Sequence, residues 1–528
     1  MRFLNLNLKN LLTCDIIQTS IIMFKNYLSI IAILCVYFTS FSQVNKNTDL
    51  DILSLKYAKS SFDELQEFFS LPNDAYQPEQ IEPNVKWCEN AFAKRGYKTQ
   101  RLETETVPLL LASRNYPNAK KTVLIYLQVD GQPVDITKWH QPDPYIPALK
   151  EQDKNGNWNI IDWNNLKGDI NRDWRIFSRS ASDARGPDMM FLKAMDIIND
   201  LKEQPNFNIK VIMDFEEELG SPRLPKAVNQ FKNELAADML VIFDGPRHLS
   251  NEPTLSYGAR GIATISLEVF GPRVPLHSGN YGNYSPNPAM KLSKLLASMW
   301  HDDGRVAIPN WYDGIIISDV VKEILKQVPD DEKQIQKDFG IASTENIGNN
   351  FQEAIQYPAL GILGMEAAWV GKSTRTIIPA TAIAELNIRL VKETEGDRMV
   401  KLVKDHIINQ GYYLVEEKPT EEERMAHDKI ARFNAEVSYG AFRTEFDTEI
   451  GAWLRKGMRT AFGKDPIEIR TGGGSIPISP FVITLGLPAV SVPTVNPDNN
   501  QHSPNENIRL GNYIDGIKTI TAILMEKL

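Results

Sequence analysis

The sequence has little cysteine: three residues in 528, of which Cys14 and Cys35 lie near the N-terminus. Without that segment, Cys88 would have no disulfide partner, and one thiol does not make a cysteine-based metal site. The chain also lacks long basic runs and carries a net charge of -9, which excludes the electrostatic footprint of a nucleic-acid-binding protein. Internal repeats and low-complexity segments are absent too. The chain is 42% apolar and 24% charged, which is the composition of a globular protein. At 528 residues it is too long for a single hydrophobic core.

The N-terminus contains a short apolar stretch. Met23 is followed by a basic Lys25, an apolar run over 27–38 and small residues up to Ser42. This run is too short to span a membrane and is typical of a secretory signal peptide. We therefore expect residues 1–42 to be a leader, with export of the protein to the periplasm or medium. A membrane anchor is the alternative.

Beyond the leader, apolar patterns of helix and strand alternate. Helices are predicted over 65–71 and 81–96, strands over 123–127, 209–215 and 239–243, a helix after Asp183, and a β-rich segment over 481–492. Strands that alternate with helices favour an α/β fold, here a mixed sheet covered by helices on both faces.

The middle of the chain has a different pattern. It predicts a strand at 263–270, a helix at 289–299, a β-rich segment at 376–389 and a helix at 395–410, while 302–357 is polar and irregular. This order suggests an inserted α+β domain. The predicted division is a first catalytic part over 43–257, the insert over 258–418, and a second catalytic part over 419–528.

Polar side chains follow several predicted strands. Gln128 and Asp130 end the strand at 122–127 and point to the same side, because strand side chains alternate. Glu216 to Glu218 follow the next strand, and Asp244 follows the one after it. Ligand sites of open α/β sheets form beyond the carboxyl ends of the strands. Carboxylates that converge there repel one another unless a cation holds them.

Two further residues could join such a site. Asp183 lies where a loop enters a helix, and His502 lies in a late polar loop. Oxygen and imidazole ligands suit zinc or another divalent transition metal. Each residue also has a structural interpretation: Asp244 as a turn residue, Asp183 as a helix N-cap, and the glutamates as a solvated charge run. Composition and spacing leave both interpretations open.

The order and wording of five motifs resemble the co-catalytic zinc metallopeptidases of clan MH. This is the family of carnosinase, aminoacylase and glutamate carboxypeptidase, and the likeness is greatest to its carnosinase-like dipeptidase branch. It extends over about 50–528. The motifs are Gln128-Val129-Asp130 with Pro133, Ser178-Arg179-Ser180-Ala181-Ser182-Asp183-Ala184-Arg185-Gly186, Glu217-Glu218-Leu219-Gly220-Ser221, Asp244 after a strand, and His502-Ser503-Pro504-Asn505-Glu506.

The resemblance implies two divalent metal ions, zinc above all, with cobalt or manganese as alternatives. Asp183 would bridge them, Glu218 and His502 would complete one position, and Asp244 with Gln128 would complete the other. Two ions together lower the pKa of a water and polarise a carbonyl.

The resemblance also assigns two catalytic carboxylates. Glu217 would be the general base, and Asp130 would orient the ligand at position 128.

The insert resembles the family's lid, or dimerisation, domain. His277 matches a lid histidine that reaches the active site of a partner subunit, which implies a homodimer. Arg389 matches an arginine that binds a substrate carboxylate, a use suited to its bidentate geometry. Gly474 and Ser475 match the loop that receives the same carboxylate. Read without the resemblance, these residues would be a surface histidine, an exposed arginine and a flexible loop.

The sequence departs from the family at several motif positions. Gln128 replaces a metal-binding histidine, Ala184 replaces the second residue of an Asp-Asp pair, and Pro275 stands where an aspartate is usual. An amide oxygen is a harder and weaker ligand than an imidazole nitrogen. Gln128 could therefore ligate, hydrogen-bond to a ligand, or leave its metal position poorly occupied.

These observations predict a metallohydrolase that cleaves a peptide or amide bond next to a carboxylate, as a dipeptidase or small-peptide carboxypeptidase. An N-acyl-amino-acid amidohydrolase is the first alternative, since the chemistry is shared. A weakened metal- or peptide-binding homologue is an alternative of another class, because of Gln128. An interaction protein without metal is a third.

Overall fold

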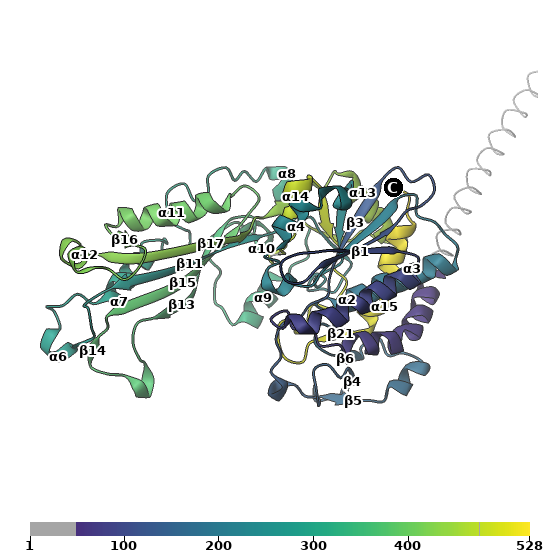
Figure 1. Ribbon diagram of the computed structural model, residues 1–528, viewed down its shortest axis with the longest axis horizontal. Helices are drawn as coiled ribbons and strands as arrows, with labels where there is room; N and C mark the ends of the chain where they lie inside the picture. Colours follow the sequence, from purple (N-terminus) through teal and green to yellow (C-terminus); the bar gives the residue numbers. More distant parts are fainter. Residues whose placement is uncertain (1–48, 475) are drawn as a thin grey trace, which may run out of the picture.

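Two β-sheets organise the chain in a computed structural model that describes residues 49–474 and 476–528. They belong to two units, and Figure 1 shows the second unit extending away from the first. The expected leader at 1–42 lies outside the described residues. Within 49–474 and 476–528, no helix has the length and apolar character that crossing a bilayer requires.

The first unit is built on a mixed sheet of eight strands, in the order β1-β2-β7-β3-β8-β20-β9-β19. Strands β7, β3, β8 and β20 are parallel neighbours. In β3, Val123, Ile125 and Leu127 enter the core on one face, and Leu124 and Tyr126 enter the core on the other. A strand buried on both faces reads as a continuous apolar run. The strands are β1 (Lys98–Leu102), β2 (Leu109–Arg114), β3 (Thr122–Gln128), β7 (Asn208–Asp214), β8 (Met239–Ile242), β9 (Thr254–Ser256), β19 (Ile467–Ile469) and β20 (Ala489–Ser491).

Helices cover both faces of this sheet, which confirms the predicted α/β class. In α2, buried Ile81, Val85, Cys88 and Phe92 recur at the helical spacing that predicted it. The helix predicted over 65–71 is the end of a longer one over 49–69. The other helices are α3 (Arg185–Asp200), α4 (Leu224–Gln230), α5 (Lys232–Leu235), α13 (Glu449–Phe462), α14 (Ser479–Leu485) and α15 (Leu510–Met525), with α2 over Ile81–Lys94 and short turns η1 (Pro78–Gln80), η2 (Ile136–Lys138), η3 (Trp163–Lys167) and η4 (Glu217–Leu219).

One secondary-structure prediction in this unit was wrong. The segment 481–492 is not continuously β-rich: α14 occupies its first part, and only β20 is a strand. Phe481 and Ile478 pack in the core under the sheet, so burial rather than strand pairing explains the apolar run. A four-stranded sheet lies beside the unit in the order β21-β6-β4-β5. Its strands are β4 (Ala148–Gln152), β5 (Trp158–Ile160), β6 (Arg175–Phe177) and β21 (Asn507–Arg509).

The second unit contains a five-stranded sheet in the order β13-β15-β11-β17-β16. Strand β17 pairs with β11 from Phe270↔Ile430 to Ile262↔Tyr439. The boundary predicted at 418 therefore falls inside this sheet, because the last long strand comes after it. The strands are β11 (Gly261–Phe270), β13 (Ala359–Glu366), β15 (Thr381–Leu390), β16 (Tyr413–Val415) and β17 (Ile430–Tyr439), with short pairs β10 (Gly258–Ala259) with β18 (Phe442–Arg443) and β12 (Leu276–His277) with β14 (Ile377–Ile378).

Helices α7 and α11 share one core with this sheet. The residues that β11 contributes to this core are Ala263, Ile265, Leu267 and Val269, which alternate along the strand and so occupy one face. Helices α7 and α11 therefore pack against this one face of the sheet. The polar stretch 302–357, which the sequence left unassigned, contains three short helices with irregular segments between them. The helices of the unit are α6 (Ser278–Tyr281), α7 (Pro288–Ala297), α8 (Asp319–Leu325), α9 (Glu332–Phe339), α10 (Phe351–Ala354), α11 (Gly396–Asn409) and α12 (Glu421–Ala426), with the turn η5 (Gly371–Ser373).

Candidate metal centre and active site

The predicted polar residues gather at one edge of the large sheet. Gln128 is the last residue of β3, Glu217 and Glu218 lie in η4 just after β7, and Asp244 follows β8. Because β7, β3 and β8 are parallel neighbours, their carboxyl ends meet at the same edge. This parallel pairing is the physical reason why these groups lie at one edge of the sheet.

Two loops bring Asp183 and His502 to the same place. Asp183 lies between β6 and α3, and its peptide bond to Ala184 is cis. His502 lies in the loop between β20 and β21. Its Nε2 is 3.0 Å from Asp183 Oδ2 and 3.4 Å from Glu218 Oε2. Ligand atoms of Asp183, Glu218 and His502 all lie within 4.8 Å of one another, a spacing that can hold a metal ion.

Charges of one sign accumulate at this edge. Burial and the neighbouring Asp183 raise the pKa of Glu218 to about 8 and that of Asp244 to about 7. Burial, with Glu218 next, also raises the pKa of Glu217 well above its usual range. The hydrogen bond to Asp183 raises the pKa of His502 to about 9. The shifts of the three carboxylates report the cost of collecting them away from water, and a divalent cation would offset that cost.

Asp130 contacts the acidic turn instead of residue 128. Its Oδ1 accepts the backbone N–H of Glu217 at 3.0 Å, and its Oδ2 accepts that of Glu218 at 2.9 Å. Gln128 is only 1% exposed, and its Nε2 donates to Asp183 Oδ1 at 2.8 Å. Its Oε1 is buried without a hydrogen-bond partner. Asp130 thus holds the backbone of η4, while Gln128 faces Asp183.

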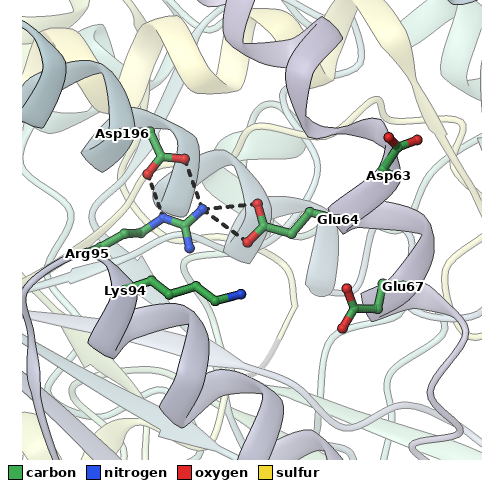
Figure 2. Close-up of a pocket in the computed structure, with 6 residues that line it drawn as sticks. All are labelled: Asp63, Glu64, Glu67, Lys94, Arg95 and Asp196. Atoms are coloured by element: carbon green, nitrogen blue, oxygen red, sulfur yellow. Dashed lines mark hydrogen bonds and ion pairs between the residues drawn. The ribbon is translucent and has the colours of Figure 1, made fainter.

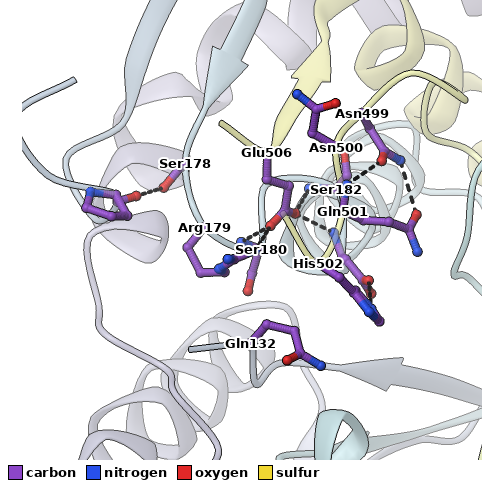
Figure 3. A network of polar contacts seen from close by, with 12 residues as sticks. Gln132, Ser178, Arg179, Ser180, Ser182, Asn499, Asn500, Gln501, His502 and Glu506 are labelled. Carbon is purple, nitrogen blue, oxygen red and sulfur yellow. Dashed lines mark hydrogen bonds and ion pairs between the residues drawn. The ribbon is translucent and has the colours of Figure 1, made fainter. Parts of the chain in front are cut away.

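Sequence reasoning missed the residues that support this arrangement. Gln132 donates to Glu218 Oε2 at 2.8 Å. Glu506 accepts the side chain of Arg179 at 2.8 Å and the backbone N–H groups of Ser180, Ser182 and Asp183 at 2.9 to 3.0 Å. Figure 3 shows this carboxylate between the serine loop and the His502 loop. Glu506 stood inside a quoted motif and Gln132 directly before Pro133 of another, but spacing along a chain does not reveal their partners.

The predicted substrate residues divide between two places. Arg389 lies near the end of β15, paired in register with Ile262. Burial, with the neighbouring guanidinium of Arg389 next, lowers the pKa of Arg260 to about 10. The backbone N–H of Arg260 donates to the carbonyl oxygen of Gly474 at 3.2 Å, so Arg389 and the glycine loop lie at the same end of the second sheet. Ser475 lies outside the described residues.

His277 is not near the acidic residues of its own chain. It caps α6, and its Nδ1 accepts the backbone N–H groups of Gly279 and Asn280. Figure 1 shows α6 at the outer end of the second unit, away from the large sheet.

A separate polar cavity of about 450 Å³ lies among the helix over 49–69, α2 and α3. Three of its charged groups are paired in the interior: Arg95 bonds to both Glu64 and Asp196 (Figure 2), and Lys193 nearby bonds to the same two acids. These pairs join three helices, and a structural role accounts for them.

Comparison with known proteins decides the family. A family model described as peptidase family M20/M25/M40 matches residues 146–526. The chain belongs to this family. Residues 146–526 include all the acids from Asp183 to Asp244 together with His502. As an M20 peptidase, the chain is an enzyme that depends on metal, as the five motifs predicted.

Individual relatives agree with this assignment. The chain is 27% identical over 434 residues to the Beta-Ala-His dipeptidase of Homo sapiens, which covers 79% of this chain and 77% of that protein. It is 26% identical over 446 residues to the Cys-Gly metallodipeptidase dug1 of Schizosaccharomyces pombe, and the match covers 82% of this chain and 86% of that protein. Its fold matches the M20 metallo-carboxypeptidase Sso-CP2 of Sulfolobus solfataricus with a TM-score of 0.73 and 26% identity, over 88% of this chain and 98% of that one.

The same relatives correct one prediction. Export to the periplasm or medium was inferred from the pattern at Met23 alone. The human dipeptidase and the Cys-Gly metallodipeptidases of two yeasts resemble this chain over most of its length, and this likeness gives no evidence of export. The prediction of an exported M20 peptidase was therefore wrong.

Proposed function

We propose that this M20 peptidase is a metallodipeptidase that cleaves the peptide bond next to the C-terminal carboxylate of a small peptide. The observation that carries the proposal is the convergence of Asp183, Glu218 and His502 within 4.8 Å, directly beside Glu217 in the chain. Dipeptidases among the relatives support the substrate class.

The donor set fits a divalent cation. Asp183, Glu218 and His502 supply two carboxylates and one imidazole, a combination that suits zinc. We propose that these three residues would hold zinc, and that Asp183 and Asp244 would together hold a second divalent ion. Two such ions, when bound, would lower the pKa of a water and polarise the scissile carbonyl.

Within this proposal, Glu217 is the general base. Its raised pKa suits a carboxylate that accepts a proton from water and then passes it to the leaving amine. Asp130 contributes by position, because its two oxygens hold the backbone of Glu217 and Glu218. A base fixed in this way needs less reorganisation during proton transfer.

The second unit would bind the substrate's carboxylate. Arg389 and the loop at Gly474 lie at the end of the sheet that adjoins the first unit. A guanidinium binds a carboxylate through two parallel hydrogen bonds, and backbone N–H groups of a glycine loop can add to them. This arrangement would select peptides with a free C-terminus. A contribution of Ser475 stays a prediction.

We also propose that the enzyme is a homodimer through its second unit. His277 lies at the outer end of that unit, so a role at an active site requires a second chain. Large apolar side chains are exposed there: Tyr284 is 88% exposed and Val370 is 86% exposed. Apolar groups left on a surface in this way mark contact sites in many proteins.

A substrate panel with metal-stripped and reconstituted enzyme tests the activity. Dipeptides should be hydrolysed after addition of zinc, cobalt or manganese, and C-terminal amides of the same dipeptides should be poor substrates. N-acyl amino acids form the comparison arm, and preferential turnover of these would identify an amidohydrolase instead. No turnover and no bound metal would overturn the proposal.

A mixing experiment tests the dimer. His277→Ala and Glu217→Gln should each be inactive alone, for different reasons. Mixed dimers would contain one site with an intact base and an intact partner histidine, so random 1:1 mixing should restore about a quarter of the activity by subunit statistics. Sedimentation velocity gives the mass independently. A monomer, or mixtures without activity, would contradict a shared site.

A further inference from the structure

Asp183 presents its two oxygens to two different partners. Oδ2 is 3.0 Å from His502 Nε2, on the side of Glu218. Oδ1 accepts Nε2 of Gln128 at 2.8 Å. Asp244 follows β8, the parallel neighbour of β3, so it lies at the same edge of the sheet as Gln128. One carboxylate therefore stands between two sets of side chains, and each set defines a position for a cation.

The two positions differ in donor chemistry. The first offers the imidazole of His502 with the carboxylates of Asp183 and Glu218. The second offers only oxygen: Asp183, Asp244 and the amide of Gln128. All seven histidines of the sequence lie in the described part of the chain, and among them only His502 joins a group of potential ligands. The family resemblance places a histidine at position 128, and no other histidine of this chain supplies an imidazole there.

The amide of Gln128 has an atom to offer. Its Oε1 is buried without a hydrogen-bond partner, although leaving a buried carbonyl oxygen unpaired is unfavourable. The terminal amide torsion of glutamine is broad and nearly two-fold. A half-turn exchanges Oε1 and Nε2, so the side chain can face Asp183 with its oxygen once a cation replaces Nε2–H as the positive partner of that carboxylate.

We propose that the two cation positions are unequal: Asp183, Glu218 and His502 hold zinc tightly, and Asp183, Asp244 and Gln128 form an oxygen-only position that takes a harder divalent ion such as Mn²⁺. The inference rests on the proposed metal-dependent function. Its physical basis is that imidazole favours zinc, whereas carboxylate and amide oxygens favour manganese or magnesium. Gln128 thereby determines the metal specificity of one position.

Metal content tests the proposal without measuring activity. Metal-stripped enzyme is dialysed against zinc alone, manganese alone, or both, and bound ions are counted by mass spectrometry. Wild type should retain one zinc per chain from zinc alone, and one zinc with one manganese from the mixture. The electron paramagnetic resonance spectrum of the bound Mn²⁺ reports the second position directly.

Two substitutions at one position should act in opposite directions. Gln128→His should raise the zinc content to two per chain and weaken manganese binding at the second position by about tenfold or more. Gln128→Met, similar in size but without the amide oxygen, should lose the manganese and keep the first zinc. Gln230→His adds an imidazole at the exposed end of α4 and should behave as wild type. Thermal melts show whether each variant is folded.

Several results would overturn the inference. Two zinc ions of equal affinity in wild type would show that the amide does not discriminate. Manganese binding by Gln128→Met as tight as in wild type would show that Oε1 is not a ligand. In both cases, hydrolysis of dipeptides would leave the proposed function standing. Absence of any bound metal, together with absence of turnover, would remove both proposals.

Discussion

The carboxylate of Glu506 accepts the backbone N–H of Asp183 at 3.0 Å, inside a fully buried setting. The same carboxylate pairs with Arg179 at 2.8 Å. Two motifs more than three hundred residues apart in sequence are joined through this one group. Glu506 therefore fixes the loop that carries Asp183.

Glu506→Gln should weaken both folding and metal binding. It leaves the buried Arg179 cation without its carboxylate, a loss of about 3–5 kcal/mol in the free energy of unfolding. Thermal unfolding of metal-free enzyme measures the first effect, and zinc competition measures the second. Glu151→Gln, an exposed residue of β4, is the control. An unchanged melting temperature would show that the network does not stabilise the loop.

Glu217→Gln should stop turnover without removing metal. An amide cannot take a proton from water, so kcat should fall by about 10²–10⁴ or more. The control is next to it: Glu216 bonds to Thr106 and Arg223, away from His502, and Glu216→Gln should keep most of the activity. Steady-state kinetics and metal counts check both variants. Comparable turnover by the two would assign the base elsewhere.

Gly186→Ala should displace the loop that carries Asp183. A Cβ at this position would lie 2.2 Å from the carbonyl oxygen of Ala181, which is backbone and cannot rotate away. Overpacking of this kind costs about 1–3 kcal/mol, and the shift should also lower zinc affinity. Gly364→Ala in β13 meets nothing within 4 Å and serves as the control. Chemical denaturation and zinc titration measure the effects, and equal behaviour of the two variants would contradict the tight packing.

Metal uptake should release protons at neutral pH. The pKa of His502 is raised to about 9 and that of Glu218 to about 8, so both hold protons at pH 7 that a cation must displace. Apparent affinity should rise with pH up to about 9. Calorimetric titrations with zinc in buffers of different ionisation enthalpy count the protons. A heat independent of buffer would show that the ligands are already deprotonated.

The same pKa shifts make the stability of the metal-free enzyme depend on pH. Because the folded pKa of His502 lies above its usual 6.5, its stabilising contribution is complete below that value and is lost as pH rises toward about 9. The raised pKa of Glu218 acts in the same direction, since the unfolded chain gives up that proton more readily. The melting temperature of metal-free enzyme should therefore fall between pH 6.5 and 9. Bound zinc should remove this slope.

Much of the site could be predicted from local pattern. Apolar runs predicted β3, β7 and β8, and the residues just after them predicted where acids would converge, because parallel neighbours end at one edge of a sheet. The motif order identified the family and the need for metal. Pattern failed at 481–492, where a buried helix and a buried strand are equally apolar, and at 418, because pairing of β17 with β11 is a long-range contact.

By itself the sequence determined which chemical groups are available, including an amide at position 128 instead of an imidazole. Only the tertiary structure decided how they pair. Asp130 binds the backbone of Glu217 and Glu218 instead of residue 128, and Glu506 holds the loop of Asp183. The physical reason is that a hydrogen bond requires donor and acceptor within about 3 Å, and such distances between remote segments arise only when the sheets and loops have packed.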